Sequence, residues 1–278
     1  MIKKIFKLLL CTVLYTIVFS LTNAVLPFSQ GFRELNTGNQ ASILFVLINA
    51  AWVCFTIYFI VRHSHTGGKK LFLNLVFVLF FVQSFMMQIE TIFFGYAFSV
   101  LTRLDFILIT LAGLPPVLAV VPLLVKFFQN KDIENVKPEI DIKSILIKLG
   151  IIGIIYTCIY MIFGYFVAWQ FEELRLFYNG SLEKLSFLGK LIDNLKTNPI
   201  IFPFQILRGI LFGAFILPLK FMIRQRNAFR ISVCLVYLCT AALLIIPNPL
   251  FPDQVRFAHL MEMTSSMFIF GIIAGSIV

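Results

Sequence analysis

The chain ends in "VRFAHLMEMTSSMFIFGIIAGSIV" (residues 255–278), an apolar stretch that is long enough to cross a lipid bilayer. Near its start the stretch carries Arg256, His259 and Glu262, spaced three residues apart. A charged group inside a membrane helix costs several kcal/mol on insertion scales, so such groups usually face protein or water. The stretch therefore predicts a membrane helix whose polar face is turned into a helix bundle.

The composition of the whole chain agrees with this interpretation. Of its 278 residues, 60% are hydrophobic and 13% are charged, whereas a soluble domain is about half apolar and about a quarter charged. This excess predicts a single integral membrane domain over residues 1–278, in contact with the lipid bilayer along its length. The net charge of +10 does not indicate nucleic acid, because the basic residues fall between apolar runs and no basic, aromatic-rich groove or zinc-finger spacing accompanies them.

Apolar segments of roughly 20 residues recur along the chain, which predicts an all-α polytopic bundle of about eight transmembrane helices. The first segment resembles a secretory signal, but its apolar run is long enough to span, and we expect it to be retained. The predicted spans are 7–27, 41–62, 71–97, 106–127, 145–169, 199–219, 229–247 and 254–277.

Lysine and arginine residues predict the orientation of the bundle. Fifteen of the 23 basic residues fall before the first span, in alternate loops or at the span ends next to these loops, all on one side, and the opposite loops are poor in them. By the positive-inside rule both termini should be cytoplasmic, in a bacterial-type inner or plasma membrane. The connection at about 171–198 is then extracytoplasmic. Within it, "SLEKLSFLGKLIDNLKT" (181–197) predicts an amphipathic helix that lies on the membrane face or packs over the bundle.

Ionisable residues of three predicted spans fall at similar depths. At 1.5 Å per residue, Glu90, Arg208 and Glu262 should lie roughly 12–13 Å inside the outer surface, and His259 about 9 Å inside it. Stray charge is penalised in lipid, so these side chains should gather at one interior place in the outer half of the membrane.

Residue spacing assigns further members to this cluster. Arg256, His259 and Glu262 follow one another at i, i+3 and i+6, and Gln205 precedes Arg208 by three. Gln83 and Glu90 are seven residues apart, which predicts a shared helix face. The predicted buried polar cluster comprises Gln83, Glu90, Gln205, Arg208, Arg256, His259 and Glu262.

Several functions are compatible with such a cluster. It can be a structural network that fixes helix register. It can line an outward-opening pocket of a small transporter that handles a polar solute or protons. It can serve an intramembrane hydrolase by acid–base chemistry, or through a metal held by Glu90, His259 and Glu262, although no H-E-x-x-H motif is present. A non-catalytic membrane subunit of a larger complex is the remaining class, and the sequence specifies no cofactor.

Small residues and helix breakers predict local packing. "GILFG" (209–213) and "GIIAG" (271–275) match G-x-x-x-G, which lets helices approach closely within the chain or in a homo-oligomer. "AGLPPVLAVVP" (112–122) should kink or break the fourth span, since proline removes backbone donors.

Overall fold

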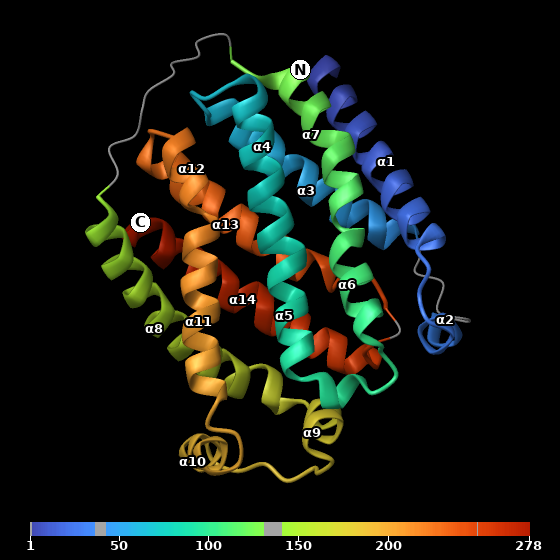
Figure 1. The fold of residues 1–278 in the computed structure, drawn as a ribbon, viewed down its shortest axis with the longest axis vertical. Coiled ribbons are helices and arrows are strands. Elements are labelled where there is room, and N and C mark those ends of the chain that lie inside the picture. The colour runs from blue at the N-terminus through green and yellow to red at the C-terminus, as the bar shows by residue number, and fades with distance from the viewer. Residues whose placement is uncertain (1, 37–42, 131–140, 249) are drawn as a thin grey trace.

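The protein is an all-α membrane helix bundle, as the sequence predicts (Figure 1). A computed structural model describes residues 2–36, 43–130, 141–248 and 250–278, and within them eight helical segments are long and apolar enough to cross a membrane. The segments are Ile2–Val25, Ile43–His63, Gly68–Phe93, Arg103–Phe128, Ile142–Gln170, Ile201–Met222, Arg226–Leu243 and Asp253–Ile277.

Four of these segments are single helices and four are subdivided. The single helices are α1 (Ile2–Val25), α3 (Ile43–His63), α13 (Arg226–Leu243) and α14 (Asp253–Ile277). The others are α4 (Gly68–Leu79), η1 (Phe80–Phe85) and α5 (Met86–Phe93); α6 (Arg103–Ala112) and α7 (Leu114–Phe128); α8 (Ile142–Phe166) and η3 (Ala168–Gln170); and α11 (Ile201–Phe215) and α12 (Leu217–Met222).

Eight crossings place the two ends of the chain on the same side of the bundle, which we call the terminal side. The short elements η2 (Gly95–Phe98), α2 (Gln30–Asn36), α9 (Glu172–Asn179) and α10 (Phe187–Thr197) lie on the opposite side, which we call the α10 side (Figure 1). The cytoplasmic location of the terminal side remains a prediction. Two lysines that support it, Lys131 and Lys137, lie outside the described residues.

Glycines set the closest helix contacts, and the predicted intrachain packing is confirmed. A Cβ atom on Gly209 of α11 would lie 2.8 Å from Gly153 Cα of α8. A Cβ atom on Gly271 of α14 would lie 2.8 Å from Cys234 Cα of α13. At both places one backbone packs directly on another, which only small residues allow.

The third and fourth spans are both irregular, and their irregular parts touch. In the third span, η1 is a π-helix, in which the Met86 N–H donates to the Phe81 carbonyl five residues back. The fourth span breaks at Gly113, as predicted, with Pro115 and Pro116 in the first turn of α7. A Cβ atom on Gly113 would lie 1.9 Å from Ser84 Oγ of the π-helix and 3.0 Å from Ser84 Cβ, so a larger residue there would displace the serine side chain.

The α10-side connection contains two helices. The helix predicted over 181–197 begins only at Phe187, because Ser186 caps it by accepting from the Gly189 N–H at 3.1 Å. Figure 1 shows α10 nearly end-on and the spans around it from the side, so α10 lies across the bundle. Its apolar residues Leu188, Ile192 and Leu195 are exposed, which is typical of a helix at a membrane surface.

Candidate functional site

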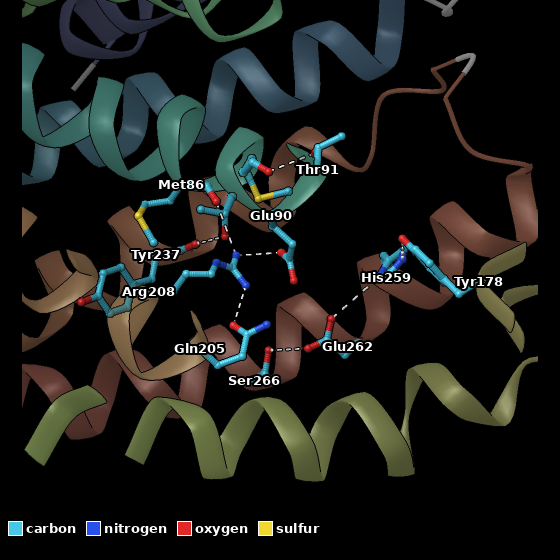
Figure 2. Close-up of polar contacts among 12 residues, drawn as sticks. Met86, Glu90, Thr91, Tyr178, Gln205, Arg208, Tyr237, His259, Glu262 and Ser266 are labelled. Atoms are coloured by element: carbon cyan, nitrogen blue, oxygen red, sulfur yellow. Dashed lines mark hydrogen bonds and ion pairs between the residues drawn. The ribbon is translucent and has the colours of Figure 1, made fainter. Parts of the chain in front are cut away.

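An ion pair between two helices lies at the centre of the site. Arg208 of α11 donates to Glu90 of α5, with 2.7 Å between Nη2 and Oε2. Arg208 is 0% exposed, and the Glu90 side chain is 22% exposed. The prediction that these two residues meet is therefore matched by the geometry, and Figure 2 shows the contact.

Further groups hold the Arg208 guanidinium in place. Its Nη1 donates to Gln205 Oε1 at 2.9 Å, and its Nη2 lies 3.4 Å from the Met86 carbonyl oxygen. The rings of Tyr156, Phe204 and Phe212 surround it, with centroids 5.6–5.9 Å from Cζ. The surrounding aromatic faces favour the positive charge. Arg208 is thereby fixed behind Glu90 and faces no open space.

A second polar chain runs along α14 and reaches α9. Glu262 is 6% exposed and accepts from Ser266 Oγ at 3.2 Å. The other oxygen, Oε2, lies 4.0 Å from His259 Nδ1, which is too long for a hydrogen bond. His259 Nε2 lies 3.0 Å from the Tyr178 hydroxyl. Figure 2 shows these residues in sequence, from Ser266 to Tyr178.

The contact with Tyr178 couples the phenol hydrogen to the tautomer of His259. Burial raises the pKa of Tyr178 well above its usual value, so the phenol keeps its hydrogen. A phenol that donates to Nε2 leaves the hydrogen of the neutral imidazole on Nδ1, the nitrogen that faces Glu262.

The Glu90 end of the ion pair and the polar residues of α14 and α9 border one cavity of about 1100 Å³. Glu90, Glu262, His259 and Tyr178 line it, and Figure 2 shows the two carboxylates pointing into the same space between α5 and α14. The lining continues to Ser181, Glu183 and other residues of the α9–α10 connection, several of them exposed. The cavity therefore joins buried carboxylates to the α10 side, and its size suits a small-molecule ligand.

Gln83 does not join this network, contrary to the prediction. It is buried beside Tyr15 of α1 and Asn49 of α3. Gln83 lies within the π-helix, whose wider turn holds one more residue, so a spacing of seven to Glu90 no longer returns to the same helix face.

Arg256 does not join the polar network either, contrary to the prediction. Its Nη1 donates to the carbonyl oxygens of Leu244 and Ile245 at 2.9 and 3.3 Å, and its Nη2 pairs with Asp253. These carbonyls end α13 and have no helical partner. Each step of three residues falls about 60° short of a full turn, so Arg256 and Glu262 are about 120° apart on α14.

The proposed three-residue metal site lacks the required geometry. Among the residues that the structure describes, no three His, Cys, Asp or Glu side chains are grouped closely enough to hold a metal ion. The Glu90 carboxylate is directed to Arg208, which leaves only His259 and Glu262 near each other.

Sequence reasoning missed Tyr178 and Tyr160, which line the cavity. Tyr178 lies in α9, whose position depends on Arg175. The Arg175 guanidinium donates to the carbonyl oxygens of Trp169 and Leu182, at 2.8 and 3.0 Å, and so holds the connection folded over the cavity. The one signal of this arrangement in the sequence is Arg175, an arginine outside the spans, which the structure buries.

Comparisons with protein-family models, with curated proteins and with solved structures find no match for this chain. Function must therefore be inferred from the site.

Proposed function

We propose that the protein is a small membrane transporter that binds a solute, or takes up protons, through the cavity on the α10 side. The observation that carries this proposal is a cavity of about 1100 Å³ that runs from exposed residues of the α9–α10 connection to Glu90 and Glu262 inside the bundle. Ionisable residues inside a membrane are costly, and where they border a cavity they typically mark a solute or proton pathway.

The arrangement favours transport over a purely structural network. A structural ion pair needs no ligand, and Arg208 is held by Glu90, by Gln205 and by the Met86 carbonyl. Glu262 is different, because no Lys or Arg among the described residues pairs with it, although it is buried. A buried carboxylate without a basic partner lowers stability, so its position on the cavity wall supports a role in binding.

The same geometry supports the hydrolase alternative less well. No three-residue metal site is formed by the described residues, and the carboxylate of Glu90 is neutralised by Arg208. The acid–base version would depend on His259 and Glu262 alone.

Flux through the purified protein in liposomes tests the proposal. Dye-reported proton flux and uptake of labelled organic solutes should exceed those of empty liposomes. Glu90→Gln and Glu262→Gln should abolish the flux. The exposed Glu172 pairs with Arg175 at 3.7 Å and is not among the described residues that line the cavity. It provides the control Glu172→Gln, which should keep the flux. No flux of any probe, together with covalent labelling of the site by an electrophile that His259→Ala removes, would favour the hydrolase instead.

A further inference from the structure

We infer that the ligand of the cavity is an organic cation with a large apolar body, and that Glu262 is its counter-ion. This inference rests on the proposed function and names its substrate class. It follows from the charge of the cavity wall, from the chemistry of the rest of the lining, and from the places where the lining is exposed.

The cavity is acidic in a basic protein. The whole chain has a net charge of +10, yet the described lining residues include four carboxylates and one lysine. That lysine, Lys190, pairs with Asp193 at 3.0 Å and stacks over Trp169. Arg208 lies behind Glu90 and is fully buried. An anionic ligand would therefore find no unpaired cation among the described lining residues. The acidic lining residues are Glu90, Glu183, Asp193 and Glu262.

Glu262 is the deeply buried carboxylate of this set, and no lysine or arginine among the described residues pairs with it, although His259 lies 4.0 Å away. Glu90 is neutralised by Arg208 and Asp193 by Lys190, while Glu183 is exposed. Glu262 is 6% exposed and receives one hydroxyl hydrogen bond, from Ser266. A cationic ligand that reached it would form a charge-assisted contact in a poorly solvated place, where such contacts are strong.

Aromatic rings make up much of the remaining wall. Around the His259 ring, Tyr178 and Phe251 lie with centroids 5.7 and 5.5 Å away, and Phe94 packs on Tyr178 at 5.7 Å. Aromatic faces attract cations and also bury apolar surface. A proton or a metal ion would need neither this lining nor a cavity of about 1100 Å³. The wall thus fits a cation that carries a large apolar body.

The lining is also exposed on the flank of the bundle. Ser20 and Asn23 of α1 line the cavity and are exposed, as Ser181 and Glu183 are at the α10 side. An amphiphilic cation collects at membrane surfaces, so access beside α1 as well as from the α10 side suits such a ligand.

Two ions of nearly equal size and opposite charge test the inference. Tetraphenylphosphonium and tetraphenylborate should be titrated against the purified full-length protein in nanodiscs, with protein-free nanodiscs as the correction for partition into lipid. Quenching of Trp169, which lines the cavity, reports binding. The phosphonium should bind at least about tenfold more tightly than the borate, since one charge-assisted contact is worth on the order of a factor of ten.

Three variants locate the counter-ion. Glu262→Gln should remove most of the preference for the phosphonium, Glu262→Asp should retain it, and the exposed control Glu172→Gln should leave it unchanged. Equal binding of the two ions by the wild-type protein would overturn the inference, whether or not Glu262→Gln folds. A preference for the borate, or a preference that survives Glu262→Gln, would overturn it as well.

The two proposals fail in different ways. If the phosphonium binds in a Glu262-dependent manner and liposomes show no flux, the cation site stands and transport is wrong. If liposomes transport another solute while both probe ions bind alike, transport stands and the cation class is wrong.

Discussion

The two sides of the bundle are built from the same helices but are packed for different purposes. On the terminal side, aliphatic side chains such as Ile60, Leu71 and Leu124 are 0% exposed and interlock across three spans. On the α10 side, α5, α11 and α14 border a cavity of about 1100 Å³, with carboxylates on its wall. One side is therefore closely packed, and the other side contains an open cavity.

The arginines of the α10 side show how charge is placed in this space. Arg256 and Arg175 donate to backbone carbonyls and hold chain segments in place. Arg208 instead pairs with a carboxylate on the cavity wall. In the part of the chain that the structure describes, no lysine or arginine pairs with Glu262, and His259 lies 4.0 Å from it. The side chains that combine burial with charge on this side thus fall into two groups, those that fix the backbone and those that set the charge of the cavity.

The largest effect is expected from removing the charge at the centre of the α10 side. Arg208→Ala leaves the Glu90 carboxylate without its partner and should lower the free energy of unfolding by about 3–5 kcal/mol. Denaturant unfolding of the purified protein in detergent measures the loss. The double variant Arg208→Met with Glu90→Met removes both charges and should recover most of it. A double variant as unstable as Arg208→Ala would show that the pair itself is not what stabilises this side.

A smaller effect should follow from disturbing the packing of the terminal side. Gly271→Ala places a Cβ atom 2.8 Å from Cys234 Cα, so α13 and α14 must move apart, at a cost of about 1–3 kcal/mol. The matched control is Gly150→Ala, since a Cβ atom on Gly150 has nothing within 4 Å. It should be neutral or stabilising by up to about 1 kcal/mol. Equal melting temperatures for the two variants would contradict the close contact.

The smallest effect should come from the hydrogen bond between α9 and α14. Tyr178→Phe removes the hydroxyl that faces His259 Nε2 and should cost about 0.5–1.5 kcal/mol. Nitrogen NMR shifts of His259 should show a change of tautomer, because Nε2 loses its partner. The exposed Tyr96 also lines the cavity, and Tyr96→Phe should leave the His259 spectrum unchanged. An unchanged spectrum in Tyr178→Phe would place the hydroxyl elsewhere.

The depth of a residue along its span predicted its contacts better than its spacing from other residues of the same span did. The eight spans follow from the length of apolar sequence that lipid requires, and the meeting of Glu90 with Arg208 follows from their common depth. The assignments of Gln83 and Arg256 depended on an unbroken helical period, which the π-helix and the drift of three-residue steps do not preserve. Tyr178 could not be predicted, since the fold of its connection depends on backbone contacts of Arg175.

The π-helix at Phe80–Phe85 rotates the second half of the third span about the helix axis relative to its first half. Because of its extra residue, α4 can keep its apolar face on the aliphatic interior while α5 presents Glu90 to α11. Deleting one residue there would turn the second half by about 100° and swing the carboxylate away from its guanidinium, with the first half undisturbed. A single inserted residue thus allows the cavity-facing part of this helix to change direction without repacking of the rest.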